Sequence, residues 1–224
     1  MPMALPVTFK GSRIARWILK AFGWKLAFDG FPTLQGVAIV YPHTSNWDFP
    51  VGILAKWALG IPANFWGKDS LFKFPIMGAW MRWVGGVPID RSSPKGVVGE
   101  MVQVFEQHKQ QGRLLWLALA PEGTRSLTPG WRSGFYQVAK GADVPLAMVK
   151  LDWGTRTLSL VDFFKLSGDV EADYAHMAQV FEGVKGYNAL QAAPVIPWSP
   201  PARNEALAST ASATDVDNNK NLHS

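Results

Sequence analysis

Residues 37–48 of this 224-residue chain read VAIVYPHTSNWD. The apolar run 37–40 predicts a buried strand, and the polar residues after it predict a turn at the carboxyl end of that strand. If a helix then begins near Pro50, Asp48 can fold back toward His43. A carboxylate that accepts the imidazole N–H fixes the tautomer of the ring and leaves the other ring nitrogen free to take a proton. The segment therefore predicts a general base, His43, that is oriented by Asp48.

A second polar segment, residues 121–126 (PEGTRS), also follows an apolar run that is typical of a buried strand. It would lie at a sheet edge, where α/β proteins bind ligands. Gly123 lets the backbone approach a ligand closely, Thr124 offers a hydroxyl donor, and Arg125 can hold a phosphate in a bidentate fork. The backbone N–H groups of this loop are candidates for stabilising an oxyanion.

A third segment, residues 85–91 (GGVPIDR), ends in Arg91, which is a second phosphate ligand by the same reasoning. Each of these segments also has a structural alternative. His43 and Asp48 can form a hydrogen-bonded turn that caps a helix, Glu122 and Arg125 can form a surface pair in a turn, and Arg91 can be a solvated loop charge.

The chain resembles the glycerolipid and lysophospholipid acyltransferase family. The resemblance rests on four ordered blocks: His-x4-Asp at 43–48, Gly-x-x-x-Ile-x-Arg at 85–91, Glu-Gly-Thr-Arg-Ser at 122–126 and a proline-containing apolar run at 144–149. It spans roughly residues 37 to 150 and implies a 1-acylglycerol-3-phosphate O-acyltransferase-like enzyme, with acyl-CoA or acyl carrier protein as donor and no cofactor. By this resemblance the catalytic residues are His43 and Asp48, and the substrate-binding residues are Arg91, Glu122, Gly123, Thr124 and Arg125.

Two positions depart from the family pattern. Pro42 stands where the family usually has Asn, and Pro88 stands where it often has Phe. Other acceptors therefore stay open, namely glycerol 3-phosphate, another lysolipid or an aminolipid. A non-catalytic, membrane-bound lipid-binding protein is the alternative from another class.

The rest of the chain alternates between predicted helices and strands. Helices are expected at 48–59, 96–110 and 172–184, and strands at 114–120, 145–152 and 157–163. This alternation predicts an α/β fold, with a single mixed sheet flanked by helices on both faces. The acyltransferase domain is expected to span 31–198, followed by a disordered tail at 199–224 that lacks periodicity.

Composition and charge favour a lipid surface as partner. Hydrophobic residues make up 48% of the chain and Trp alone occurs 11 times, yet no apolar run is long enough for a simple spanning helix. The net charge of +5 is concentrated in the first half, where basic residues lie among Trp and Phe. No nucleic-acid module is recognisable, so no nucleic acid is expected as partner. The lack of cysteine excludes disulfides and a Cys-acyl intermediate, and no metal-binding motif occurs.

Two segments are candidates for contact with a membrane. From residue 12 onward, Ile14, Trp17, Ile18, Ala21 and Phe22 predict an amphipathic helix that Gly23 interrupts. Residues 1–30 are therefore expected to form a membrane-attachment segment, and the Trp-rich stretch 57–83 a second membrane face. The alternative is an ordinary surface helix packed on the core. The prediction is peripheral, monotopic attachment to the cytoplasmic face of a membrane.

Overall fold

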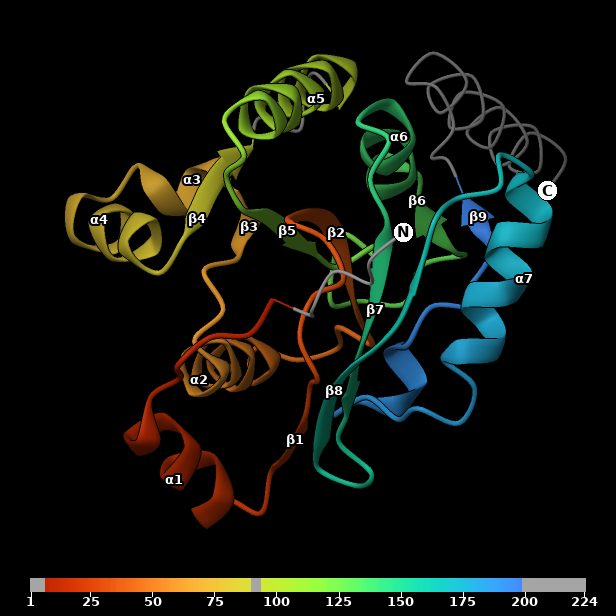
Figure 1. The fold of residues 1–224 in the computed structure, drawn as a ribbon. Coiled ribbons are helices and arrows are strands. Elements are labelled where there is room, and N and C mark those ends of the chain that lie inside the picture. The colour runs from red at the N-terminus through yellow and green to blue at the C-terminus, as the bar shows by residue number, and fades with distance from the viewer. Residues whose placement is uncertain (1–6, 90–93, 199–224) are drawn as a thin grey trace, which may run out of the picture.

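The structure is a computed structural model that describes residues 7–89 and 94–198. Seven strands form one sheet in the order β1-β8-β7-β2-β5-β3-β4 (Figure 1). All neighbours in it are parallel except β7 and β8, which form an antiparallel pair. These strands are β1 (Lys25–Ala27), β2 (Gln35–Tyr41), β3 (Asn64–Lys68), β4 (Gly86–Ile89), β5 (Leu115–Leu119), β7 (Leu146–Asp152) and β8 (Thr157–Phe164).

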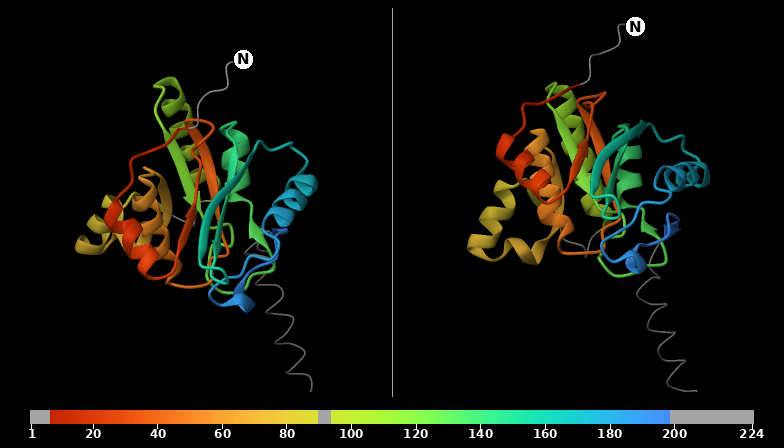
Figure 2. Two further views of the ribbon diagram at one scale, coloured as in Figure 1. Left: turned by 60° about the horizontal axis from the view of Figure 1, so that its bottom comes forward. Right: turned by 90° about the horizontal axis from the view of Figure 1, so that it is seen from below.

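Helices cover both faces of this sheet (Figures 1 and 2). Helices α1 (Arg13–Ala21) and α2 (Asp48–Leu59) lie on one face, and α5 (Pro94–Gln110), α6 (Gly134–Gly141) and α7 (Val170–Val180) lie on the other. The remaining elements are α3 (Asp69–Phe72), α4 (Pro75–Trp83), the short helix η1 (Ala189–Gln191) and a two-stranded pair of β6 (Trp131–Arg132) with β9 (Pro197–Trp198). The predicted α/β class with a single mixed sheet flanked by helices is confirmed for the described residues.

The central strand β2 shows why the sheet needs helices on both sides. Val37 and Ile39 point into the core under α5, α6 and α7, whereas Ala38 points into the core under α1 and α2. Because successive side chains of a strand alternate between faces, a strand that is apolar at every position is stable only when both faces are covered.

Most predicted elements are confirmed, with ends that differ by a few residues. Helix α2 spans the predicted 48–59, and β5, β7 and β8 match the predicted strands. Strand β3 was not predicted, because residues 57–83 mix aromatic and basic residues without the alternation that marks a strand. The short strands β1 and β4 were not predicted either. The predicted tail at 199–224 lies outside the described residues.

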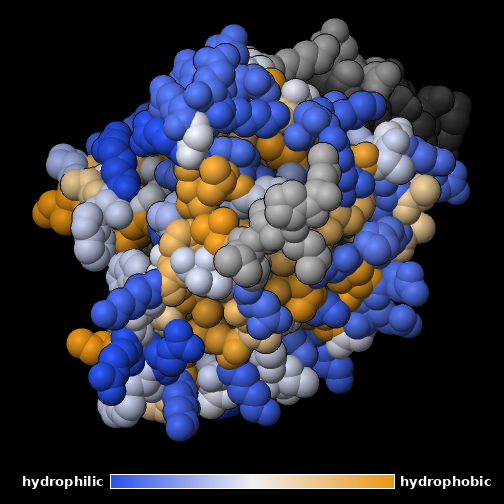
Figure 3. Space-filling model, viewed as in Figure 1, coloured by the Kyte–Doolittle hydropathy of each residue, from blue (hydrophilic) through white to orange (hydrophobic). Residues whose placement is uncertain are grey.

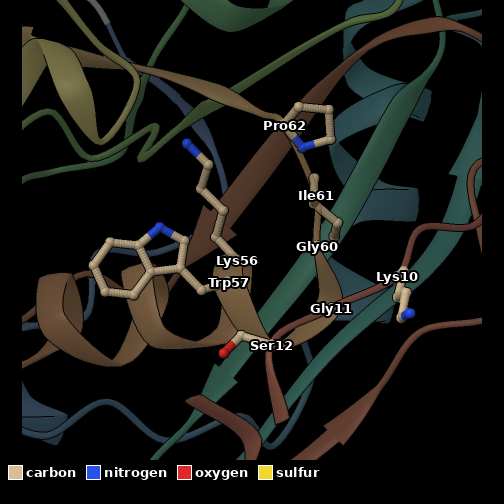
Figure 4. A pocket seen from close by; sticks show the side chains of 8 residues that line it. All are labelled: Lys10, Gly11, Ser12, Lys56, Trp57, Gly60, Ile61 and Pro62. Carbon is tan, nitrogen blue, oxygen red and sulfur yellow. The ribbon is translucent and has the colours of Figure 1, made fainter. Parts of the chain in front are cut away.

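The N-terminal segment is tied to the end of α2. Ser12 N donates to Trp57 O at 2.8 Å, and Arg16 Nη2 donates to Ala58 O at 2.8 Å. The two backbones come so close that a Cβ on Gly11 would lie 1.9 Å from Ala58 O. A surface hollow of about 580 Å³ borders this junction. Figure 4 shows the side chains that line it.

Helix α1 is short, and one side of it packs against the core. It ends at Ala21, before Gly23 with φ 77°, and it buries Ala15 and Leu19 against the core. Ile14 and Trp17, from the predicted apolar stripe, are 73% and 69% exposed. The helix therefore packs on the core and presents part of its apolar stripe to solvent, and its role at a membrane stays a prediction. Among the described residues, no helix combines the length and apolar character needed to cross a bilayer.

Candidate active site

The loop between β2 and α2 brings His43 and Asp48 together at the carboxyl edge of the sheet. His43 Nδ1 lies 3.1 Å from Asp48 Oδ2. The side chain of His43 is 22% exposed, whereas that of Asp48 is 2% exposed. In the right-hand view of Figure 2 this loop follows the orange strand β2 to the lower edge of the sheet. With Nδ1 directed at the carboxylate, Nε2 is the ring nitrogen placed to accept a proton from a substrate.

Asp48 is held as a hydrogen-bond acceptor on both oxygens. Its Oδ2 accepts the backbone N–H groups of Thr44 and Ser45, each at 2.8 Å, and its Oδ1 accepts Trp153 Nε1–H at 2.7 Å. Three neutral donors, in addition to the imidazole, satisfy a carboxylate that is almost completely buried.

Glu122 lies beneath the same loop. It is 1% exposed, its Oε2 accepts His43 N–H at 2.6 Å, and its Oε1 accepts Ala193 N–H at 3.2 Å. Burial raises the pKa of the Glu122 carboxyl, and the N–H donors of Ala193 and His43 oppose that rise. The carboxylate thus contacts the backbone that carries the proposed base. Its predicted role in substrate binding stays a prediction.

The other residues of the 122–126 loop lie nearer to solvent. Gly123 adopts φ 69°, and a Cβ at this position would lie 2.8 Å from Arg132 Cδ, so both backbone conformation and space favour glycine. Thr124 is half-buried and Arg125 is exposed. Arg91 lies outside the described residues, so its predicted role as a second phosphate ligand is not tested.

A C-terminal segment, residues 185–193, forms a further wall of the site. Asn188 N donates to Thr44 Oγ1 at 3.1 Å, and Asn188 Nδ2 donates to Thr44 O at 2.9 Å. Tyr41 Oη–H donates to Ala193 O at 2.9 Å. This segment therefore contacts the His43 loop at both ends.

Sequence reasoning did not find Trp153, Asn188 or Ala193 as members of the site. Trp153 follows directly on the predicted strand 145–152, and the carboxyl ends of parallel neighbours meet at one edge. Its place at this edge of the sheet could therefore have been inferred from that strand, but its contact with Asp48 could not. Asn188 and Ala193 follow no strand and belong to no motif, so the sequence alone carries no signal for them.

An apolar cavity of about 210 Å³ lies between α2 and the sheet, with His43 and Asp48 in its lining. Helix α2 contributes Phe49, Gly52 and Ile53, and the sheet contributes residues from β2, β3, β5, β7 and β8. Trp116 and Phe31, whose rings stack with centroids 4.0 Å apart, also line it. The pair His43–Asp48 thus borders a space that an aliphatic chain can fill.

The chain is similar to known acyltransferases. It is 26% identical to the chloroplast 1-acyl-sn-glycerol-3-phosphate acyltransferases BAT2 of Brassica napus, over 132 residues, and LPAT1 of Arabidopsis thaliana, over 131 residues. These matches cover 57% of this chain but only 37% and 36% of the relatives, so the chain spans little more than a third of their length. The crystal structure of the 1-acyl-sn-glycerophosphate acyltransferase PlsC from Thermotoga maritima aligns with a TM-score of 0.46 and 20% identity, over 73% of this chain and 72% of that one.

A sequence profile described as "Acyltransferase" matches residues 28–151, which is more than half of the chain. The matched region contains the loop of His43 and Asp48, the loop of Glu122 and Arg125, and most of the strands that carry them. The chain belongs to the acyltransferase family.

Proposed function

We propose that the chain is an O-acyltransferase that moves a fatty acyl group from acyl-CoA or acyl carrier protein to the free hydroxyl of a lysophospholipid. The favoured acceptor is 1-acylglycerol 3-phosphate, which would give phosphatidate. The observation that carries this proposal is the His43–Asp48 pair at 3.1 Å beside an apolar cavity. The 1-acyl-sn-glycerol-3-phosphate acyltransferases among the relatives support the same class of acceptor.

The reaction needs one base and no covalent enzyme intermediate. Nε2 of His43 takes the proton of the acceptor hydroxyl as its oxygen attacks the thioester carbonyl carbon. The new C–O bond forms, the tetrahedral intermediate collapses with breakage of the C–S bond, and the leaving thiolate takes the proton from the imidazolium. Asp48 stabilises the imidazolium while it exists, because a carboxylate at 3.1 Å favours the charged ring.

The cavity suits the acyl chain of the donor. Its lining is mostly aliphatic and aromatic, and each methylene that leaves water there contributes about 0.8 kcal/mol to binding. A thioester carbonyl near His43 would place the chain between α2 and the sheet. Arg125, exposed on the neighbouring loop, and Arg91 are then the cations for the phosphate of the acceptor.

This proposal can be tested by giving the protein one labelled acyl-CoA and a panel of acceptors and measuring acyl transfer to each. Lysophosphatidate should give phosphatidate, and His43→Ala and Asp48→Ala should each lose most of the turnover while staying folded. Arg125→Ala and Arg91→Ala should raise the KM for lysophosphatidate. Arg113→Ala is the control and should leave this KM unchanged, because Arg113 lies in the connection that enters β5 at the opposite edge of the sheet.

The outcomes separate the alternatives. A His43→Ala variant with near-normal turnover would exclude this mechanism, and an unchanged KM in both arginine variants would exclude the phosphate acceptor. Turnover with glycerol 3-phosphate, another lysolipid or an aminolipid in place of lysophosphatidate would reassign the acceptor. Binding of lipid without turnover for any donor or acceptor would favour the non-catalytic alternative.

The enzyme is further proposed to attach peripherally to the cytoplasmic face of a membrane, where its lipid acceptor resides. Exposed apolar side chains over α1 and α4 support this (Figure 3). On α4 and the residue before it, Phe74 is 66% and Ile76 88% exposed, and Trp80 and Trp83 are exposed as well. Aromatic rings with basic neighbours suit the headgroup region of a bilayer.

Two double variants test the attachment. Ile14→Ser with Trp17→Ser changes α1, and Ile76→Ser with Met77→Ser changes α4; all four side chains are exposed, so the fold should tolerate the changes. Co-sedimentation with anionic vesicles should weaken severalfold for each. Leu34→Ser, an exposed apolar residue just before β2, is the matched control. Equal sedimentation of all three variants and the unchanged chain would contradict the attachment model.

A further inference from the structure

Asp48 and Trp153 meet although 105 residues separate them in the sequence. The indole Nε1–H donates to Asp48 Oδ1 at 2.7 Å, on the oxygen opposite to the one that faces His43. Trp153 stands two residues beyond the region that matches the acyltransferase family, and no sequence motif includes it. It is therefore a part of this site that the family pattern does not define.

The geometry of the carboxylate shows what the indole adds. Both backbone donors, Thr44 N and Ser45 N, bind Oδ2, and so does His43 Nδ1. These contacts hold Oδ2 and restrain rotation about the Cβ–Cγ bond of Asp48. The indole on Oδ1 adds a contact to the other oxygen, so any displacement of the carboxylate must break hydrogen bonds on both of its oxygens.

Trp153 can supply a fixed point because its own ring is held. It makes edge contacts with Trp24, at a centroid distance of 4.9 Å, and with Tyr187, at 4.8 Å. Its backbone N–H donates to Lys185 O at 2.8 Å. The indole thus lies between the N-terminal segment and the C-terminal segment, and its N–H points at the carboxylate.

We propose that Trp153 is a positioning residue for the acyl transfer: through its N–H on Asp48 it sets the orientation of the carboxylate and, through it, of the His43 ring. This inference rests on the proposed function of the His43–Asp48 pair. The indole N–H also polarises the carboxylate. Its hydrogen bond to Oδ1 draws negative charge away from Oδ2, the oxygen that faces the imidazole. Removal of the N–H leaves Asp48 Oδ1 without this donor and loosens the pair.

The test compares Trp153→Phe with Trp131→Phe in the full chain. Trp131 is a fully buried indole whose Nε1 has no hydrogen-bond partner among the residues that the structure describes. Both changes remove an indole and keep an aromatic ring, but only the first removes a hydrogen bond to Asp48. Thermal melting of both variants shows how much of any effect is loss of folding.

In the acyl-transfer assay, Trp153→Phe should lower kcat roughly 10- to 100-fold with little change in the KM for the acceptor, the size expected for a hydrogen bond to a charged group. The pH profile of kcat/KM should also change, because the carboxylate that holds the proposed base has lost one of its donors. The other carboxylate that contacts this loop, Glu122, is unchanged in both variants. Trp131→Phe should keep the kcat and the pH profile of the unchanged enzyme at temperatures where it is folded.

Nuclear magnetic resonance of the His43 ring distinguishes a failure of this inference from a failure of the proposed function. The ring nitrogen and Nδ1–H signals of His43, identified with a His43→Gln variant, should shift in Trp153→Phe and stay in place in Trp131→Phe. If the unchanged chain transfers no acyl group but these shifts occur, the function is wrong and the positioning role stands. Unshifted His43 signals in a folded Trp153→Phe variant, or kcat and pH profiles equal to those of Trp131→Phe, would overturn the inference.

Discussion

The hydroxyl of Tyr41 connects the strand that carries the site to the C-terminal segment. Tyr41 is the last residue of β2 and is 8% exposed, and its Oη–H donates to Ala193 O at 2.9 Å. Its ring packs against Trp131 and Phe181 with centroid distances of 5.1 Å each. Tyr41→Phe keeps these ring contacts and removes only the donor.

The expected loss of stability follows from that single contact. A net hydrogen bond contributes about 1 kcal/mol, and the carbonyl of Ala193 left without its donor adds part of its desolvation, so the total is about 1–2 kcal/mol. For a chain of this size the melting temperature should fall by about 3–6 °C. Ala193 also donates to Glu122, which accepts from His43 N–H, so turnover should fall a few-fold as the loop loosens.

The difference in unfolding free energy between the unchanged protein and Tyr41→Phe should depend on pH in the alkaline range. Burial, with a smaller contribution from the nearby Glu122 charge, raises the pKa of Tyr41 to about 12. Between the ordinary tyrosine value near 10 and this value, the native state keeps a proton that the unfolded chain releases. The unchanged protein therefore loses stability relative to Tyr41→Phe as the pH rises through this window, and the gap between them narrows.

Urea unfolding followed by tryptophan fluorescence, at pH 7 and at pH 11, measures both effects. Tyr187→Phe is the matched control, because Tyr187 is 51% exposed. The control should match the unchanged protein within about 0.5 kcal/mol. A Tyr41→Phe variant that unfolds at the same urea concentration as the control at pH 7 would refute the contribution assigned to this hydrogen bond.

Three further changes probe the site. Gly52→Leu places a side chain into open space beside the cavity and should lower kcat/KM for long-chain donors roughly tenfold more than for short-chain donors; equal loss for both would contradict the acyl-chain assignment. Gly123→Ala should destabilise the fold by about 1–2 kcal/mol in urea unfolding, because alanine at φ 69° is strained and its Cβ would meet Arg132. Asn188→Ala removes the donor to Thr44 O and should cost about 1 kcal/mol, and an unchanged unfolding midpoint would show that Asn188 N alone holds the loop.

The sequence predicted the His43–Asp48 pair because both residues lie in one short loop between a strand and a helix. Local order along the chain is enough to place two side chains that are separated by a turn, and the observed distance of 3.1 Å agrees with it. The two-faced core was also predictable, since the apolar run of β2 can be stable only when both faces of the sheet are covered.

Contacts between distant segments could not be predicted in the same way. The partner of Asp48 Oδ1 is 105 residues away, and the residue that binds Thr44 is 144 residues away. Their positions depend on the order of strands in the sheet, which places β5 and β7 on either side of β2. Hydrophobic periodicity reports which residues are buried, but it does not specify which strands become neighbours.

The contacts of residues 185–193 indicate that this segment unfolds together with the His43 loop. Ala193 N donates to Glu122, Asn188 donates to Thr44, and Lys185 O accepts from Trp153 N–H, so this segment is hydrogen-bonded to the His43 loop and to residues that contact it. Native-state hydrogen exchange should show the amides of this segment opening together with those of the loop. A fragment cut at residue 151, where the family match ends, would lose every one of these contacts. Such a fragment would keep the central strands, the motifs and the bond from His43 N–H to Glu122, but its His43 loop would lose the contacts that Trp153 and residues 185–193 supply.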